Sequence, residues 1–171
     1  MKVLIRPFLE DDLDSLVKNA NNPRVAANLT DAFPSPYTLE NGKAFLERIM
    51  KQDPLDVLGI EVDGQLVGNI GIHPQSDVNR LNAELGYFIG EEHWGKGIMP
   101  IAIQLMVDYA FSHFDIIRIF ARPFGSNKAS QRVLEKSGFT FEARIPQILI
   151  KNGRLEDEII YGIRKKERMN E

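Results

Sequence analysis

The sequence predicts an α+β fold with α/β/α layers, in which a mixed, mostly antiparallel sheet is flanked by helices. Strand and helix patterns interleave along the chain without the regular βαβ period of a parallel sheet. Two pairs of strand-like segments are joined by the turn signals Asp63-Gly64 and Asn152-Gly153, which favour antiparallel hairpins. The length of 171 residues suits one domain, which we expect to span residues 1–171.

The first third of the chain reads as one strand followed by three helices. The strand is expected at residues 2–8, and the helix at 10–21 has acidic residues in its first turn, where the helix dipole favours them. A short helix is expected from Pro23, because proline is tolerated in the first helical turn. After a proline-containing loop at residues 31–37, Thr38 is expected to cap a third helix.

The rest of the chain is rich in β-structure and holds two further helices. One helix begins near Ile98, and its pattern is apolar on most sides, which indicates burial. The other lies within residues 127–139, where Gly138 can end the helix and let Phe139 fold back onto Leu134. Strands are expected at residues 56–62, 65–73, 80–90, 116–123, 140–150 and 154–164.

Composition excludes several classes of protein. The formal net charge of −3 provides no overall basic field to hold nucleic acid. The chain has no cysteine, so disulfides, thiolate zinc sites and cysteine nucleophiles are excluded, and we expect no metal site. The apolar stretch near the N-terminus is too short for a signal peptide, and no apolar run reaches transmembrane length. We therefore expect a cytoplasmic protein that binds neither nucleic acid nor membranes.

The segment Gly95-Lys96-Gly97 stands between a predicted strand and a predicted helix, and two interpretations apply to it. It can be an ordinary glycine turn before a core helix. Alternatively, the glycines let backbone N–H groups approach an anion at the helix N-terminus, where Lys96 adds a positive charge. The segment is neither a Walker loop nor a Rossmann fingerprint, so it does not decide between the two by itself.

A second connection from strand to helix bears on the choice between a turn and an anion-binding site. Asn127 follows the predicted strand at 116–123 and opens the next helix. Considered alone, Asn127 would be a simple helix N-cap and Ser130 an exposed helical residue. The two connections have to be interpreted together.

Together they resemble the GNAT superfamily of acyl-CoA-dependent N-acetyltransferases. The resemblance covers nearly the whole chain and rests on "RPF…DD", "LVGNIGI", "AELGYFI" followed by "WGKGIM", and "NKASQRVLEKSGF". It is strongest with the RimJ/RimL-like branch, which acetylates ribosomal-protein N-termini, while many relatives in that branch act on other amines. It implies acetyl-CoA as co-substrate and, as acceptor, an amine of a small molecule or a protein N-terminus.

The resemblance also implies where CoA binds. Two parallel central strands, expected at 80–90 and 116–122, splay apart, and the pantetheine arm pairs with the first of them like an added strand. In the pyrophosphate-binding pattern, Gly97 matches the central glycine, whereas Trp94 and Met99 replace the usual residues. The implied CoA-binding residues are Phe88, Ile89, Gly95, Lys96, Gly97, Ile98, Met99, Asn127 and Ser130, with the Phe88 and Ile89 region also providing the N–H for the thioester oxyanion.

Catalysis needs a base that takes a proton from the ammonium form of the acceptor. Glu84 is the first candidate, because strand alternation places it on the face of Phe88, and His73 is the second. Each can equally be an ordinary surface residue of a strand. Leu134 stands where many family members have a tyrosine that protonates the leaving thiolate, so Ser130 is the candidate to assist the thiolate by hydrogen bonding.

The expected function is therefore transfer of an acetyl group from acetyl-CoA to a primary amine by direct attack in a ternary complex, since no cysteine can form an acyl-enzyme. A CoA-binding or sensing domain that has lost catalysis remains the alternative, and a phosphate-binding scaffold unrelated to CoA is a third reading. Asp31, Tyr37 and Glu40 are candidates to bind a cationic acceptor. The sequence leaves the acceptor and the formation of a homodimer open.

Overall fold

A computed structural model describes residues 1–166 and contains one seven-stranded sheet with the strand order β1-β2-β3-β4-β5-β7-β6. All neighbouring strands are antiparallel except the central pair β4 and β5. The predicted domain extends to residue 171, and its last five positions lie outside the described residues. The strands are β1 (Val3–Arg6), β2 (Val57–Val62), β3 (Gln65–Pro74), β4 (Asn82–Ile89), β5 (Arg118–Ala121), β6 (Thr140–Lys151) and β7 (Arg154–Arg164).

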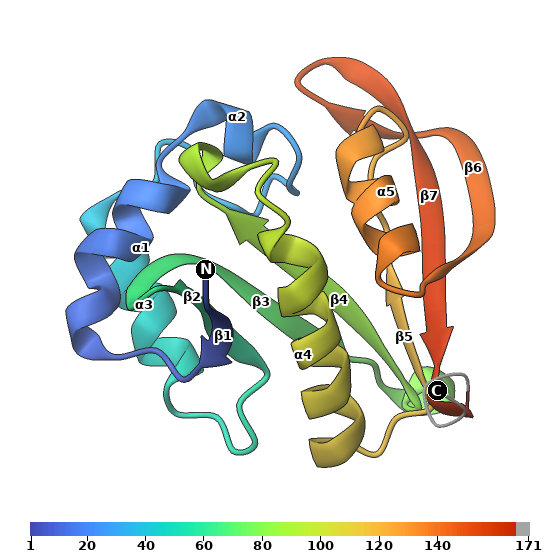
Figure 1. Ribbon diagram of the computed structural model, residues 1–171. Helices are drawn as coiled ribbons and strands as arrows, with labels where there is room; N and C mark the ends of the chain where they lie inside the picture. Colours follow the sequence, from blue (N-terminus) through green and yellow to red (C-terminus); the bar gives the residue numbers. More distant parts are fainter. Residues whose placement is uncertain (167–171) are drawn as a thin grey trace.

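Helices cover both faces of the sheet, so the predicted layered α+β class is confirmed (Figure 1). Buried side chains of α4 and α5 form one core cluster with the sheet, and those of α1 and α3 form a second cluster around Phe8, Leu66 and Phe88. The helices are α1 (Leu13–Ala20), α2 (Pro23–Ala26), α3 (Leu39–Ile49), α4 (Ile98–His113) and α5 (Lys128–Lys136), with 3-10 turns at η1 (Glu10–Asp12), η2 (Asp77–Asn79) and η3 (Glu91–His93).

The predicted caps and turns bound several of these elements. Thr38 caps α3, because its hydroxyl accepts the Asn41 N–H. In the β2–β3 hairpin, Asp63 and Gly64 both have positive φ, as a two-residue hairpin turn requires. At the end of α5, the Phe139 N–H donates to the Leu134 carbonyl oxygen at 3.0 Å, which confirms the predicted helix end.

The central pair of strands separates soon after it forms. β4 and β5 pair only where Asn82–Glu84 lies beside Arg118–Phe120, and β4 then continues to Ile89 without β5 beside it. Figure 1 shows the two strands meeting at one end and diverging toward the other. β5 is shorter than predicted and ends before Pro123, which cannot donate a backbone hydrogen bond to a ladder. The predicted splay between the two parallel strands is confirmed.

The divergence leaves one edge of β4 open. The Gly90 N–H donates to the Val67 carbonyl oxygen of β3, while the Leu81 carbonyl oxygen accepts the Ile117 N–H on the β5 side. Backbone groups alternate in direction along a strand, so odd-numbered residues of β4 direct their N–H groups toward β5. Beyond Glu84, the N–H groups of Tyr87 and Ile89 therefore face the open edge.

Candidate functional site

A cleft of about 580 Å³ occupies the splay. Its walls are the open half of β4, the connection from β4 into α4, the segment after β5 and one face of α5. Every residue that the sequence assigned to CoA binding lines this one cleft, although these residues come from three separate parts of the chain. Those that line it are Phe88, Ile89, Gly95, Lys96, Gly97, Ile98, Met99, Asn127 and Ser130.

The start of α4 forms a backbone cradle at one end of the cleft. Gly95 and Gly97 have φ of 70° and 75°, the left-handed region that glycine adopts without strain. A Cβ at either position would meet no atom within 4 Å, so space for a ligand lies in front of both. Within residues 1–166, the N–H groups of Gly95, Lys96 and Gly97 have no hydrogen-bond partner. Ile98 and Met99 point their side chains into the core and offer the cleft their N–H groups.

Positive charge gathers along this cleft. Four basic side chains line the cleft, and Glu84 is the only carboxylate that lines it in the described part of the chain. The sequence indicated Lys96 alone, although the basic residues of α5 follow Asn127 at helical spacing. An anionic ligand would find both N–H donors and counter-charges here. The four basic residues are Lys96, Arg122, Arg132 and Lys136.

Trp94 links the cradle to β4. Its indole N–H donates to the Ile89 carbonyl oxygen at 2.9 Å, and this oxygen would otherwise face the open edge unpaired. The guanidinium of Arg24 lies 5.5 Å from the centre of the Trp94 ring. The resemblance to the GNAT pattern implies Gln or Arg at this position, and here an aromatic side chain holds the loop through a hydrogen bond instead.

The open edge of β4 differs in one detail from the sequence-based expectation. The expectation assigned the oxyanion-binding N–H to the Phe88 and Ile89 region, but alternation directs the Phe88 N–H toward β3. The donors facing the splay are those of Tyr87 and Ile89. The Phe88 side chain is buried in the second core cluster and contacts the Phe33 ring edge-on, at 5.3 Å between centroids. Phe88 therefore shapes the cleft wall from the far face of the sheet.

Asn127 and Ser130 lie together at the start of α5. The side-chain oxygen of Asn127 accepts the Ser130 N–H at 3.1 Å, so Asn127 is an N-cap. The Asn127 side-chain NH₂ has no partner within residues 1–166 and is available to a ligand. The Ser130 hydroxyl lies 2.5 Å from the Tyr87 hydroxyl across the cleft. Burial raises the pKa of Tyr87 to about 12, despite the opposing effect of its hydrogen bond with Ser130.

Glu84 and His73 are direct neighbours, which the sequence did not predict. They face each other across the antiparallel pair of β3 and β4. Arg122 binds both carboxylate oxygens of Glu84, at 2.9 and 2.8 Å, and lies 3.4 Å from a Glu158 oxygen. This bidentate ion pair stands where β4 and β5 separate, and it argues against Glu84 as a free base. The ring of His73 makes no hydrogen bond in the described part of the chain.

The three residues named for the acceptor do not converge. Asp31 forms an ion pair of 2.9 Å with Lys151 at the tip of the β6–β7 hairpin. Tyr37 is buried, and its ring packs against Phe33. Glu40 is exposed on α3. The ion pair of Asp31 with Lys151 instead connects the loop after α2 to the β6–β7 hairpin.

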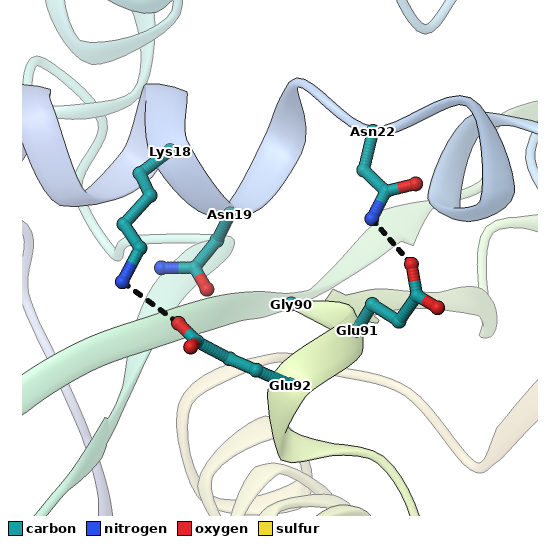
Figure 2. Close-up of a pocket in the computed structure, with 6 residues that line it drawn as sticks. All are labelled: Lys18, Asn19, Asn22, Gly90, Glu91 and Glu92. Atoms are coloured by element: carbon teal, nitrogen blue, oxygen red, sulfur yellow. Dashed lines mark hydrogen bonds and ion pairs between the residues drawn. The ribbon is translucent and has the colours of Figure 1, made fainter.

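A second cavity of about 510 Å³ lies on the other side of the β4–α4 connection, between α1 and η3. Its charged groups bind one another. Figure 2 shows the Lys18 amine directed at Glu92 and the Asn22 amide directed at Glu91, at distances of 2.8 and 2.7 Å. Arg24 also pairs with Glu91. These contacts attach η3 to α1 and α2 and leave few groups for a ligand.

Two negative observations concern residues 1–166. No helix there combines the length and the hydropathy needed to cross a membrane. No three His, Cys, Asp or Glu side chains there are grouped to hold a metal ion.

The sequence matches a known family of proteins. Residues 2–140 match the acetyltransferase (GNAT) domain family. The chain is 40% identical over 175 residues to the uncharacterized N-acetyltransferase YoaA of Bacillus subtilis (strain 168), and the match covers 96% of this chain and 94% of that protein.

Two solved structures with bound CoA share the fold. Spermidine N-acetyltransferase from Vibrio cholerae, in complex with CoA and spermine, has a TM-score of 0.82 at 21% identity, over 98% of each chain. RimL, a ribosomal L7/L12 α-N-protein acetyltransferase in complex with CoA, has a TM-score of 0.82 at 20% identity, over 96% of this chain and 94% of that one.

The family match spans most of the chain, and the same residues build the splayed strands and the glycine cradle. The chain belongs to the GNAT family of acetyltransferases.

Proposed function

We propose that the protein transfers the acetyl group of acetyl-CoA to a primary amine, by direct attack within a ternary complex. The observation that carries the proposal is the continuity of the cleft. It joins an anion-binding backbone cradle at the start of α4 to the unpaired N–H groups along β4. Such a cleft suits a ligand with a pyrophosphate at one end and an extended amide-containing arm at the other.

The residues present fit CoA at each part of the cleft. The N–H groups from Gly95 to Met99, together with Lys96, would hold the pyrophosphate. The open edge of β4 would pair with the pantetheine amides. The free NH₂ of Asn127 would donate to a CoA oxygen from the opposite wall. Each group that would meet a phosphate here is an N–H donor or a basic side chain.

In the proposed reaction, the protein positions both substrates and stabilises the developing charge. CoA supplies the acetyl group as an activated thioester. One of the two N–H groups that face the splay, that of Tyr87 or that of Ile89, would donate to the thioester carbonyl oxygen as it gains negative charge, and the other would pair with a pantetheine amide. Ser130 stabilises the departing sulfur by a hydrogen bond, in place of the tyrosine that many relatives carry at the position of Leu134. Holding both substrates in one cleft supplies the proximity advantage of the ternary complex.

The proposed reaction also needs a base that takes a proton from the acceptor amine. Glu84 and His73 are the two candidates, and Arg122 occupies both oxygens of Glu84. Glu84 lines the cleft and His73 does not, but the ring of His73 makes no hydrogen bond within residues 1–166. We therefore propose His73 as the base, with Glu84 and Arg122 holding the vertex of the splay. Glu84→Gln and His73→Gln separate them. We expect His73→Gln to lower kcat with a loss that shrinks at alkaline pH, where more of the amine is neutral. The same profile in Glu84→Gln alone would assign the base to Glu84.

The acceptor class follows from relatives and not from this cleft. RimL acts on a ribosomal protein N-terminus and the Vibrio cholerae relative on spermidine. We place the protein in the RimJ/RimL-like branch on the sequence motifs, with a protein N-terminus or a small polyamine as acceptor, and we propose a cytoplasmic location.

A homodimer is also proposed. β6 is an edge strand, and it and β7 expose large apolar side chains. Light scattering of the purified protein tests this directly, and a mass of one chain would contradict it. The exposed side chains are Phe141, Ile145, Ile148, Ile150 and Leu155.

The test of the function combines binding and turnover. At a CoA concentration of about 100 times its Kd, unfolding should require about 2.7 kcal/mol more free energy, whereas ATP should stabilise weakly. Thiol release is then measured with acetyl-CoA and a panel of N-terminal peptides, polyamines and aminoglycosides. Intersecting double-reciprocal lines support a ternary complex. Parallel lines with an acetylated protein would overturn direct transfer, and binding of CoA without acetylation of any amine would favour the sensing domain.

A further inference from the structure

A hydrogen bond between two hydroxyl groups crosses the cleft, and the function proposed above does not use one of them. The Tyr87 oxygen on β4 lies 2.5 Å from the Ser130 oxygen on α5. The Tyr87 ring packs against the main core cluster, and both residues line the cleft. The pair therefore joins the two walls of the splay between which an acetyl-CoA arm would pass.

The number of hydrogen atoms in this pair decides what it can do. Each hydroxyl carries one hydrogen, and the bond between them uses one. The pKa of Tyr87 is raised to about 12 by burial, so the phenol keeps its proton near neutral pH. If Tyr87 donates to Ser130, the hydrogen of Ser130 is left for a third atom in the cleft. That arrangement suits an anionic acceptor in front of Ser130.

The surroundings of Ser130 indicate which atom accepts its hydrogen. An arm paired with the open edge of β4 runs past the N–H groups of Tyr87 and Ile89, so its thioester end lies near the Tyr87–Ser130 pair. The position of Ser130 is fixed twice, by the N-cap Asn127 at its N–H and by Tyr87 at its hydroxyl. Leu134, one turn further along α5, is fully buried and offers no hydroxyl.

We propose that Tyr87 is a positioning residue, which holds the Ser130 hydroxyl as a hydrogen-bond donor to the sulfur of CoA. The inference rests on the acetyl-CoA-dependent function proposed above. As the amine nitrogen bonds to the acetyl carbon and the C–S bond breaks, the electron pair of that bond stays on sulfur, and Ser130 donates a hydrogen bond to the thiolate. The thiolate takes its proton from solvent after release, and neither hydroxyl forms a bond to the acetyl group.

The test measures the pKa of the CoA thiol in the binary complex, through the ultraviolet absorbance of the thiolate, and needs no acceptor. A donor to the thiolate lowers that pKa below the ordinary thiol value. Tyr87→Phe and Ser130→Ala should each raise it by about one unit relative to wild type. The double variant should show no further rise beyond Ser130→Ala, because Tyr87 acts through Ser130.

Tyr109→Phe is the matched control. The Tyr109 hydroxyl also makes one hydrogen bond, to the Leu55 carbonyl oxygen at 2.7 Å, and lies outside the cleft. Its removal should leave the thiol pKa unchanged. The other charged or titratable groups facing the cleft are the same in all variants, so a difference between variants isolates the hydroxyl pair. These groups are Glu84, His93, Lys96, Arg122, Arg132 and Lys136.

The outcomes separate this inference from the function on which it rests. Failure of the wild type to bind CoA overturns both. CoA binding with the same thiol pKa in wild type and Tyr87→Phe overturns the role of Tyr87 alone, and additive shifts in the double variant overturn its action through Ser130. If Tyr87→Phe does not fold, fluorotyrosine at position 87 keeps the packing and strengthens the donor, so the thiol pKa should fall; no change would contradict the inference.

Discussion

Two cavities of similar volume, about 510 and about 580 Å³, flank the connection from β4 to α4, and they differ in what their walls leave unbonded. On the side of α1 and α2, Glu91 and Glu92 are paired with side chains of those helices. On the side of the splay, the N–H groups from Gly95 to Gly97 have no partner within residues 1–166. Volume alone would not distinguish the two, whereas unused donors do.

The two sides support each other physically. Pairing on the first side restrains η3, which leads directly into the glycines whose N–H groups face the cleft. A donor that is held in place before the ligand arrives loses less conformational entropy when it binds. Trp94 belongs to both sides, because its ring lies under Arg24 while its N–H holds the Ile89 carbonyl. We therefore expect substitutions on the side of the splay to weaken ligand binding strongly, and substitutions on the side of α1 and α2 to weaken it little.

The largest effect is expected from Gly97→Val. A β-branched side chain at φ 75° strains the backbone and stands between the N–H groups and the pyrophosphate. Affinity for CoA should fall roughly 10- to 100-fold, as for loss of a hydrogen bond to a charged group. Isothermal titration with CoA measures this.

Gly64→Val is the matched control for that strain. Gly64 also has a positive φ, 86°, and open space at its Cβ, but it lies in the β2–β3 turn. Both variants should lose stability, by about 1–2 kcal/mol for a left-handed β-branched residue. Only Gly97→Val should lose CoA affinity. Equal affinities in the two variants would make Gly97 a turn residue and remove the difference between the two sides.

Trp94→Phe should give the next largest effect. It keeps the ring under Arg24 but removes the N–H donor, so the Ile89 carbonyl oxygen loses its partner at the edge of the cleft. The expected loss is about 1 kcal/mol in CoA binding, near the net value of one hydrogen bond. Thermal-shift titration in CoA measures it, and an unchanged titration curve would show that the ring alone fixes the loop.

Sequence patterns could predict the fold and the CoA side of the site because both depend on local chemistry. The turn at Asp63-Gly64, the cap at Asn127 and the glycines before α4 each act within a few residues of themselves. The motifs at the connection from β4 to α4 and at the connection from β5 to α5 together resemble those of the GNAT family. The splay followed from that resemblance and not from periodicity.

Contacts between distant residues could not be predicted in the same way. Glu84 and Arg122 are 38 residues apart, and Tyr87 and Ser130 are 43 apart. Strand alternation placed Glu84 on the face of Phe88 but could not show that an arginine just after β5 would bind both its oxygens. The direction of the Phe88 N–H was missed for a related reason, because it depends on pairing with β3.

Arg24→Ala tests the other side of the comparison and should have a small effect. It removes the Arg24 pair with Glu91 and the contact with the Trp94 ring, but the arginine is mostly exposed. Exposed ion pairs contribute about 0–1 kcal/mol, so CoA affinity should fall less than in Trp94→Phe, and the effect should shrink further in high salt. A loss equal to that of Gly97→Val would show that pairing behind the loop controls the cradle.

The smallest effect concerns His93, which ends η3 and lines the cleft. Burial lowers the pKa of His93, while the nearby Glu92 carboxylate opposes that shift. Above about pH 6.5 the imidazole is neutral in the folded and the unfolded chain and contributes nothing to pH dependence. As the pH falls below that value, the unfolded chain takes up the proton first, so the free protein loses a little stability.

Bound CoA should oppose this loss, because its phosphates favour the protonated imidazole in the cleft. The pKa of His93 should therefore rise when CoA binds, and by linkage CoA affinity should increase as the pH falls through the same range. Proton NMR can follow each ring, since the chain has 3 histidines. His113 is the internal control, because it lies at the far end of α4 and outside the cleft. A CoA-induced shift of equal size at both rings, or none at His93, would show that the anion does not bind beside η3.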